Sequence, residues 1–569
     1  MIYKPLPIGI DDFEKIITND FYYVDKTLLI KELLDKRGEA NLFTRPRRFG
    51  KTLNLSMIKY FFEKPIDGNS RKYLFDGMKI MDAGEKYTGL QGQYPVITLT
   101  LKSAKQGNWD MSYKSLIEEI ANEFERHDYV LSCENVLEEE KEKFRAIRGR
   151  RGEPIDYAKA LAFLSKILYQ YHKKKVIILL DEYDVPLENA YYRGFYDKMI
   201  DFIRSLFESA LKTNPYLEFS VITGCLRISK ESIFTGLNNL KIISILSTDY
   251  GEYYGFVEEE VENMLKYYGL EHKMGIMKEW YDGYLFGNME VYNPWSVINY
   301  MDGLISNENA FPTAAWSNTS SNSIVKDLIG RASKEVQNEV EKLVNGGTIE
   351  KKVHEDITYE DIYATEDNLW NFLFFTGYLK QVGMRMEDVD RYVTMAIPNN
   401  ELFYVYKNTI ETWFHDKVKV QDLTTLYEGM FSGNAEIFEA ELKKQLYGTI
   451  SYMDNKESFY HGFLLGLMAN LKEYHMKSNR ESGDGRYDIC VCHDDVTIPP
   501  VLLELKIAKR YRELNAACEA ALAQIEEKNY GAELVEEGYE EMICYGIAFF
   551  KKQVKVHVKR KVLEDELAD

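Results

Sequence analysis

The sequence of 569 residues is poor in cysteine and has no long apolar run. Six cysteines are few for this length, and five of them lie among apolar or helical residues, which favours reduced thiols over a secreted disulfide framework. No uninterrupted apolar run approaches about 18 residues, and the opening residues MIYKPLPIGIDDFEK carry acids where a signal peptide has its apolar core. We therefore expect a soluble, cytoplasmic protein without a membrane partner.

The cysteines also give no clear metal site. Cys490 and Cys492, with His493 beside them, form a CxC that is similar to half of a zinc site. No second Cys/His pair stands at finger spacing, so we interpret both cysteines as small apolar residues on one face of the strand YDICVC.

Net positive charge is absent as well. The 71 Lys and Arg are outnumbered by 91 Asp and Glu, which gives −20 at pH 7. Such a field repels nucleic acid unless cations gather locally. Residues 1–60 hold 11 Lys and Arg against 8 Asp and Glu, and residues 451–569 hold 16 against 22, with many of these cations near the last strand. The net charge therefore still allows a local track of basic residues that binds nucleic acid.

The remaining composition is that of an ordinary globular protein. Hydrophobic residues make up 45% and charged residues 28%, which excludes a disordered, collagen-like or coiled-coil chain. At roughly 150 residues per domain, the length predicts three to four domains. The pattern of elements indicates an α/β domain over 1–246, a mainly helical region over 247–450 and a small α/β domain over 451–569.

In the first domain, short β-branched runs alternate with helical stretches, which is typical of a parallel sheet with crossover helices. Residues 195–211 place apolar side chains at helical spacing and should pack on this sheet. Residues 135–153 are dense in both charge signs and should form an exposed insertion of helix and loop. The predicted strands are 41–45, 96–101, 176–181, 219–224 and 242–246.

The segment NLFTRPRRFGKTLNLS runs from strand to turn to amphipathic helix, the setting of a phosphate-binding loop. Gly50 lets the backbone approach phosphates, Lys51 can reach the β- and γ-phosphates, and the Thr52 hydroxyl can bind Mg²⁺. The pattern GxxxxGK[ST] fails at its first glycine, where Arg45 stands before Pro46. The phosphate cradle is therefore expected to be altered.

Acids at the end of a later strand support a nucleotide site. The apolar run VIILLDEYD ends in Asp181, which can hold the Mg²⁺ shell, and in Glu182, which can activate water. The next predicted strand ends in Thr223 and Gly224, where a polar residue can sense the γ-phosphate. Ligands bind at such strand ends in doubly wound sheets.

Four segments, RPRRFGKTLNLS, LLDEYDVPL, ITGCLRISKESIFTGLNNL and WYDGYLFGN with VYNPWS, occur in one order, and together they resemble the AAA-ATPase-like family of mainly bacterial proteins. The resemblance implies an AAA-type ATP-binding domain with a helical lid, a nuclease-like domain at the carboxyl end, and a possible homo-oligomer. It also implies that Arg227 senses phosphate, unless it forms a surface salt bridge, and that Arg47 and Arg48 contact phosphate or a neighbouring subunit. The expected nucleotide-binding residues are Arg47, Arg48, Phe49, Gly50, Lys51, Thr52, Leu53, Asp181, Thr223 and Arg227.

The last domain carries a second set of chemical groups. In GDGRYDICVCHDDVTIPPVLLELK, Asp488 lies near the start of one predicted strand and Glu504 and Lys506 at the end of the next. Glu504 and Lys506 are two residues apart and so share one face of the strand, while Leu505 points into the core. Two carboxylates can hold Mg²⁺, which binds a scissile phosphate and acidifies a water that the lysine orients. Helices are predicted at 457–471 and 515–528, and strands at 487–492, 501–505, 542–550 and 554–558.

This arrangement resembles the PD-(D/E)XK nuclease superfamily, although Tyr487 stands where its motif has proline. The resemblance implies that Glu457 is a further acid borne on a helix, with His461 one turn later, and that Gln524 is the glutamine of the following helix. Glu481 competes with Glu457 for the role of the extra acid, and spacing does not choose between them.

The last predicted strand, with the sequence VKVHV, alternates apolar and basic residues. Its basic face suits a phosphate backbone, and equally an edge strand charged against aggregation.

The main hypothesis is an ATP-binding and ATP-hydrolysing protein with a Mg²⁺-dependent nuclease that cuts DNA or RNA. The rival is an ATP-dependent switch or scaffold whose nuclease-like domain binds nucleic acid or protein without cutting. A third possibility is that the altered loop binds ATP without hydrolysing it.

Overall fold

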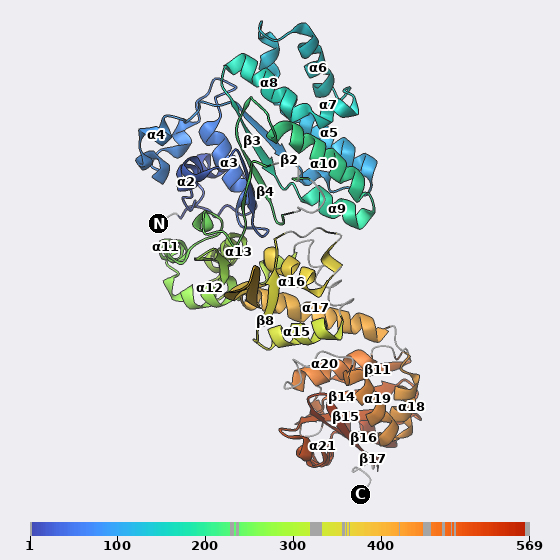
Figure 1. The fold of residues 1–569 in the computed structure, drawn as a ribbon. Coiled ribbons are helices and arrows are strands. Elements are labelled where there is room, and N and C mark those ends of the chain that lie inside the picture. The colour runs from blue at the N-terminus through green and yellow to red at the C-terminus, as the bar shows by residue number, and fades with distance from the viewer. Residues whose placement is uncertain are drawn as a thin grey trace. The chain divides into compact units, whose positions relative to one another are not determined.

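The computed structural model of the chain (Figure 1) describes residues 3–227, 233–234, 238–318, 333–355, 359, 361–363, 365–419, 422–447, 457–468, 471, 473–478, 481–482 and 485–563. For a few of these, among them Glu457 and Glu481, only the backbone is described. The chain divides into two compact units, which we describe one at a time: Met1–Thr319 with Thr348–Val405, and Ser320–Gly347 with Tyr406–Asp569.

A parallel five-stranded sheet is the centre of the first unit, as the alternating pattern predicts. Strands β1, β3 and β4 are almost wholly buried, which explains why they occur in the sequence as continuous apolar runs, whereas the edge strand β5 is partly buried. The strand order is β2-β3-β4-β1-β5, and the last strand ends three residues before its predicted end. The bounds are β1 (Ala40–Thr44), β2 (Val96–Thr100), β3 (Val176–Asp181), β4 (Leu217–Gly224) and β5 (Leu240–Ile243).

Helices cover both faces of this sheet. α3 (Lys51–Phe62) lies on one side, and α5 (Trp109–Arg126), α8 (Ala160–His172) and α10 (Tyr196–Leu211) lie on the other (Figure 1). The apolar face of α10 is buried, as its spacing predicts. Because all five strands run the same way, their carboxyl ends meet at one edge of the sheet. The other helices before residue 247 are α1 (Phe13–Thr18), α2 (Leu28–Lys36), α4 (Glu85–Thr88), α6 (Glu138–Arg148), α7 (Pro154–Ala158) and α9 (Val185–Arg193).

The charged segment expected as an exposed insertion contains α6, whose inner stripe is packed. Phe144 and Ile147 are fully buried, and the Phe144 ring lies 4.9 Å from that of Phe124 on α5. The outer face is solvated, as its charge density predicts. Two apolar residues in a charged run are enough to dock a helix.

The rest of the first unit is helical, with two small antiparallel sheets that the sequence pattern did not indicate. One is a hairpin of β6 and β7, and the other has the strand order β8-β10-β9. β9 has the sequence KQVGMRME and is mostly exposed, so it lacks the alternation of buried and exposed residues that signals a strand. The bounds are α11 (Glu258–Tyr268), α12 (Met274–Tyr281), β6 (Tyr284–Phe286), β7 (Met289–Val291), α13 (Pro294–Ser306), β8 (Ile349–Val353), α16 (Glu366–Phe375), β9 (Lys380–Glu387), β10 (Asp390–Ala396) and α17 (Asn400–Lys419), which begins in this unit.

The second unit is built on a five-stranded sheet of order β11-β14-β15-β16-β17, in which only β15 and β16 are parallel. Leu503 and Leu505 of β15 are buried on one face with residues of α18, α19 and α20. α21 packs on the other face, where Ala548 contacts Cys518. The bounds are α15 (Lys334–Val344), α18 (Thr424–Ser432), α19 (Ala435–Tyr447), α20 (Glu457–Met468), β11 (Tyr474–Ser478), β12 (Glu481–Ser482), β13 (Gly485–Arg486), β14 (Ile489–His493), β15 (Val501–Ile507), α21 (Leu514–Glu527), α22 (Ala532–Glu536), β16 (Glu541–Phe550) and β17 (Gln553–Val562).

No helix in the described part of the chain is both long enough and apolar enough to cross a membrane.

A buried acid links three helical segments of the first unit. Glu401, in the first turn of α17, accepts hydrogen bonds from the backbone N–H of Trp316 at 2.9 Å and from the hydroxyl of Ser296 on α13 at 2.8 Å. Burial raises the pKa of this carboxyl to about 7, and these hydrogen bonds oppose the rise. The folded protein therefore holds the Glu401 proton more tightly than the unfolded chain does.

We predict that this carboxyl makes the stability of the first unit depend on pH. Its contribution is fully present below the ordinary value of 4.5 and is lost as the pH rises to about 7. Glu401→Gln keeps the acceptor for Trp316 and removes the titration, so the variant should be more stable than the parent above pH 7, by roughly 3 kcal/mol. Unfolding of both proteins across this pH range measures the effect. Glu259→Gln, at an exposed position of α11, is the control, and equal pH dependence in parent and Glu401→Gln would contradict the prediction.

Candidate functional site

The turn between β1 and α3 has the backbone that an anion site needs. Gly50 adopts a left-handed conformation with φ of 78° at the amino end of α3, and no atom lies within 4 Å of the position that a Cβ would take there. Arg48 is also left-handed, with φ of 70°. The first N–H groups of α3 have no intrahelical acceptors, and they add to the positive end of the helix dipole. The backbone is therefore free for a phosphate at Gly50.

Lys51 points back across this turn. Its exposed fraction is 6%, and its ammonium donates hydrogen bonds to the backbone carbonyls of Arg45 at 2.9 Å and Pro46 at 2.8 Å. It also lies 3.6 Å from the Cys225 sulfur. The lysine holds the turn closed from inside, with its charge directed at the space that the turn surrounds.

Asp181 connects the turn with two strand ends, as the spacing of the motifs predicts. One carboxylate oxygen accepts a hydrogen bond from the Thr52 hydroxyl at 2.7 Å, and the other accepts from the Thr223 hydroxyl. Glu182 follows in a left-handed conformation with φ of 52°. Burial, and then the neighbouring Asp181 charge, raise the pKa of Glu182. Residues more than 40 positions apart in the chain thus meet beside Lys51.

Arg45, at the position of the missing glycine, does not face this space. Its fully buried guanidinium donates to the carbonyls of Thr44 at 3.0 Å and Ile243 at 2.9 Å, and lies over the rings of Tyr254 and Phe286. Burial lowers its pKa to about 10. The arginine joins the ends of β1 and β5 to the segment after the sheet, so its role is structural.

The other residues of the arginine-rich turn contact side chains of the same unit. Arg47 forms an ion pair with Glu188 of α9, and Arg48 lies 4.2 Å from the centre of the Trp295 ring. Phe49 packs edge-on against Tyr284, with ring centres 4.9 Å apart. Arg227 is partly buried just beyond β4 and next to residues outside the description. Contacts of these arginines with phosphate or with another subunit stay predictions.

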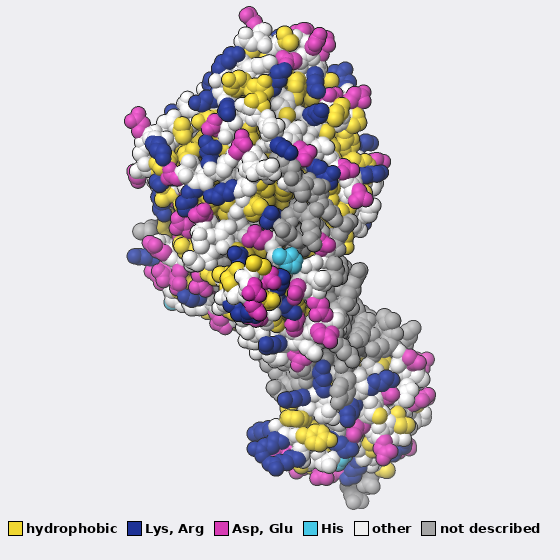
Figure 2. Space-filling model, in the orientation of Figure 1, with side chains coloured by type: hydrophobic (Ala, Val, Ile, Leu, Met, Phe, Trp, Pro, Cys, Tyr) yellow, Lys and Arg dark blue, Asp and Glu magenta, His cyan; other side chains and the backbone are white. Residues whose placement is uncertain are grey.

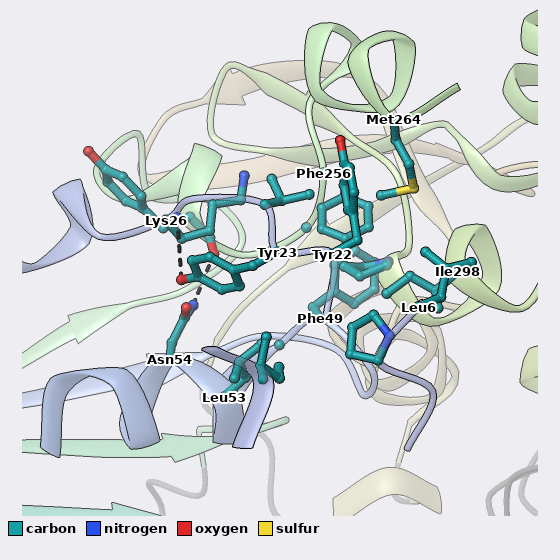
Figure 3. Close-up of a pocket in the computed structure, with 17 residues that line it drawn as sticks. Leu6, Tyr22, Tyr23, Lys26, Phe49, Leu53, Asn54, Phe256, Met264 and Ile298 are labelled. Carbon is teal, nitrogen blue, oxygen red and sulfur yellow. Dashed lines mark hydrogen bonds between the residues drawn. The ribbon is translucent and has the colours of Figure 1, made fainter. Parts of the chain in front are cut away.

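A mainly apolar cavity of about 80 Å³ lies beside Gly50 (Figure 3). Phe49, Leu53 and Asn54 line it from the turn and α3, and Tyr22 and Phe256 line it from segments far away in the sequence. Lys26 reaches it with its alkyl chain, while its ammonium is bound to Glu260 and to the carbonyl of Glu252 at 2.6 Å. No motif marked this cavity, because its walls come from several separate stretches of chain between Leu6 and Ile298.

Asp184, to which no motif assigns a role, joins the ends of β3 and β4. Its carboxylate accepts from the backbone N–H groups of Cys225 at 2.7 Å and Leu226 at 3.2 Å. The hydroxyl of Tyr183 donates to the Leu226 carbonyl at 2.6 Å. The available signal in the sequence was the run LDEYD, which places a third acid after Asp181 and Glu182. In the structure this third acid is buried.

In the second unit, the strand register brings Asp488 to Glu504. The β14–β15 ladder ends at the pair Ile489 and Leu503, and Asp488 lies one residue beyond it. Its carboxylate accepts the Leu505 N–H at 2.8 Å, a donor that the ladder leaves free. Asp488 is therefore fixed at the edge of the strand that carries Glu504 and Lys506.

Glu504 is the centre of this group. One carboxylate oxygen accepts from the Gln524 amide at 2.6 Å and from the Lys506 ammonium at 3.3 Å. The other oxygen is buried and has no hydrogen-bond partner. Burial and the Asp488 charge raise the pKa of Glu504 to about 7, and Lys506 opposes the rise. The predicted set of Asp488, Glu504, Lys506 and Gln524 thus lies together.

These groups fit a divalent cation. A buried carboxylate oxygen without a donor, beside a second carboxylate, is stabilised when a cation binds both. Among the described side chains no cluster of three His, Cys, Asp or Glu is placed to hold a metal. The side chains of Glu457 and Glu481 lie outside the described residues, so the choice between them as the third acid stays open.

Two further residues support the site. An imidazole nitrogen of His461 lies 3.0 Å from the Asp488 carbonyl and 2.9 Å from the Ser478 hydroxyl, so it ties α20 to the start of β14. Gln524 also donates to the Tyr530 hydroxyl at 2.9 Å. Tyr530 was missed because it lies in a loop without a motif.

The basic face of β17 is largely paired with acids. Lys555 lies 2.9 Å from Glu439, and Lys559 forms an ion pair with Glu526. Val554 and Val556 are buried, as the alternation predicts. These ion pairs favour the interpretation of β17 as a charged edge strand over that of a phosphate track.

Comparison with known families assigns both sites to classes. Residues 7–234 match a family described as Predicted AAA-ATPase, and residues 455–559 match the PD-(D/E)XK nuclease superfamily. The chain therefore carries an AAA-ATPase-like domain followed by a PD-(D/E)XK nuclease superfamily domain, which confirms the combination that its motifs predict.

The chain is also similar to a curated protein of Azotobacter chroococcum mcd 1, described as an uncharacterized protein in the vnfD 5′ region. The two are 29% identical over 299 residues, which is 52% of this chain and 51% of that protein. The chain thus spans about half the length of this relative.

We predict that the close approach of α21 to β16 positions Gln524 over Glu504. A Cβ at Gly546 would lie 2.3 Å from the Cys518 carbonyl of α21, so Gly546→Ala must push the helix away. The variant should lose about 1–3 kcal/mol of unfolding free energy. Calorimetric unfolding measures this loss. Gly462→Ala, on α20 where no atom lies within 4 Å of the new methyl, is the control and should not destabilise. A Gly546→Ala variant as stable as the parent would contradict the packing argument.

Proposed function

We propose that the protein binds and hydrolyses ATP in its first unit and cleaves phosphodiester bonds of DNA or RNA, with Mg²⁺, in its second. The observation that carries this proposal is the convergence of separated residues at two sites. Thr52, Asp181 and Thr223 meet beside Lys51, and Asp488, Glu504, Lys506 and Gln524 meet at the edge of β15. Both sets contain the groups that their reactions require.

At the first site, the N–H groups that follow Gly50 hold the phosphates and Lys51 neutralises the β- and γ-oxygens. Thr52 and Asp181 would hold Mg²⁺, which would supply positive charge for the phosphate oxygens during transfer. Glu182 accepts the proton of the attacking water, a role for which its raised pKa suits it. Thr223, whose hydroxyl donates a hydrogen bond to Asp181, senses the γ-phosphate. The cavity beside Gly50 takes the base, with Phe49 and Tyr22 among its apolar walls.

At the second site, Asp488 and Glu504 would hold Mg²⁺, which would supply positive charge for the scissile phosphate and for the attacking water. Lys506 orients that water and stabilises the negative charge on the phosphate. Gln524 fixes the rotamer of Glu504 through its 2.6 Å hydrogen bond. The product is a hydrolysed phosphodiester. We further propose that ATP binding gates this activity, and that the protein works in the cytoplasm, where its six free cysteines stay reduced.

The nuclease proposal predicts that Lys506→Ala lowers Mg²⁺-dependent cleavage of labelled DNA or RNA at least about 100-fold, because the lysine acts on the water and the phosphate. In a calorimetric titration with Mg²⁺, Asp488→Asn should weaken binding at least about tenfold, since it removes one of two charged ligands. Lys444→Ala, an exposed change on α19, should leave both unchanged. Cleavage by Lys506→Ala at the rate of the parent would contradict the assignment of Lys506 to the cleavage site. Mg²⁺ binding without cleavage by the parent would instead favour the non-cleaving scaffold.

The ATPase proposal separates binding from hydrolysis. Lys51→Ala should weaken ATP binding by tenfold or more, because the ammonium that lies within the turn before α3 is lost. Glu182→Gln should bind ATP like the parent and release phosphate about 100-fold more slowly, because the amide accepts no proton. Fluorescent-nucleotide binding and phosphate release measure these outcomes, with Lys198→Ala on α10 as a surface control. Equal phosphate release by parent and Glu182→Gln would exclude Glu182 as the base.

A further inference from the structure

Beyond Lys506 the chain forms a short basic loop, residues 509–512, with the sequence KRYR between β15 and α21, and Tyr511–Glu513 form one 3-10 turn at its end. All four side chains are exposed. The residues on either side are anchored, since Ala508 and Leu514 are both 6% exposed and pack with Cys518 and Ala548. The Ala508 N–H also continues the ladder to β16 with a 2.9 Å bond to Phe549. The loop is therefore held firmly at both ends while its side chains project into solvent.

The charge of this loop is not offset as the charge of β17 is. From Lys506 to Arg512 there are four cations and no acid. Arg510 comes only within 4.0 Å of Glu513, at the limit of an ion pair, with both side chains well exposed. Figure 2 shows Lys and Arg side chains gathered on the side of the second unit where Figure 1 labels α21, with hydrophobic side chains beside them. In a chain of net charge −20, such a group attracts a polyanion locally.

An aromatic residue stands among these cations. Tyr511 lies between Arg510 and Arg512 and is 64% exposed, so its ring is open to a stacking partner. A ring flanked by arginines offers a base a flat partner and offers the adjoining phosphates two cations. Stacking and charge attraction are the two contacts by which proteins commonly hold single-stranded nucleic acid.

The loop also lies next to the cleavage residues. Lys509 follows Lys506 by three positions, roughly 10 Å along an extended chain. The same loop leads into α21, which carries Gln524 to Glu504. A strand bound by the loop therefore passes beside the carboxylates.

We propose that residues 509–512 bind single-stranded nucleic acid and guide it to Asp488 and Glu504. Lys509, Arg510 and Arg512 hold successive phosphates, and Tyr511 stacks on one base. Stacking needs a base whose face is free, which a paired duplex does not offer at a groove, so the substrate class is a single strand or an unpaired segment. This inference rests on the proposed nuclease function and names its substrate.

Binding measured apart from cleavage tests the inference. Full-length protein carrying Asp488→Asn is titrated into a fluorescent single-stranded oligonucleotide and into the matching duplex, and anisotropy is recorded at several salt concentrations. Adding Lys509→Ser, Arg510→Ser and Arg512→Ser should weaken single-strand binding at least tenfold and reduce the slope of log K against log salt by about 2. Tyr511→Ala should weaken single-strand binding about tenfold and leave duplex binding unchanged, whereas Tyr511→Phe should bind like the parent.

A matched triple change tests whether position matters. Lys559→Ser, Arg560→Ser and Lys561→Ser remove the same charge from β17, where the register with β16 places them four to six residue rows from Lys506, roughly 13–20 Å away. This variant should bind like the parent. Equal losses in both triple variants, no loss in the loop variant, or equal effects of Tyr511→Ala on single strand and duplex would overturn the inference. If the parent protein binds nucleic acid through the loop but does not cleave it, the result would support the proposed role of the loop and contradict the proposed nuclease function.

Discussion

A carboxylate taken out of water must be satisfied by hydrogen bonds or by a cation, and both sites of this chain follow from that constraint. Asp181 is satisfied within the protein, because hydroxyls on α3 and β4 occupy its two oxygens. Asp184 is held on one oxygen by two backbone N–H groups, and its other oxygen is buried without a hydrogen-bond partner. The bonds of Asp181 and Asp184 join the ends of β3 and β4 to each other and to α3. Glu504 also has one buried oxygen without a partner, and the charge of Asp488 beside it makes this pair of carboxylates suited to a cation.

The parts of this structure that could be predicted from the sequence are those that depend on the order of residues within a short segment. Buried parallel strands are continuous apolar runs, and groups at their carboxyl ends must meet, so Thr52, Asp181 and Thr223 were placed correctly without coordinates. Glu504 and Lys506 follow from the two-residue period of a strand. Asp488 needed only the register of the adjoining strand, which a hairpin supplies.

The parts that were missed depend on which segments meet in space. The altered cradle expected from Arg45 stays a prediction, but the location of its side chain depends on the carbonyl of Ile243 and the rings of Tyr254 and Phe286, which spacing does not relate to it. The cavity beside Gly50 is formed by residues as far apart as Leu6 and Ile298. The basic residues of β17 formed a clear pattern, but their acidic partners lie on α19 and α21 and in β16, which no spacing rule relates to them. The basic residues of the loop at 509–512 follow no periodic pattern, and the loop lies outside every helix and strand that was predicted from the sequence.

The position of Lys51 sets a threshold for ligands of the first unit. Two backbone carbonyls and the Cys225 sulfur accept from the Lys51 ammonium, so an anion that takes a hydrogen bond from this lysine competes with one of these acceptors. An anion with several oxygens can also reach the N–H groups after Gly50 and recover the loss through several contacts at once. The acceptors within the turn therefore act as internal competitors of any anion that binds there.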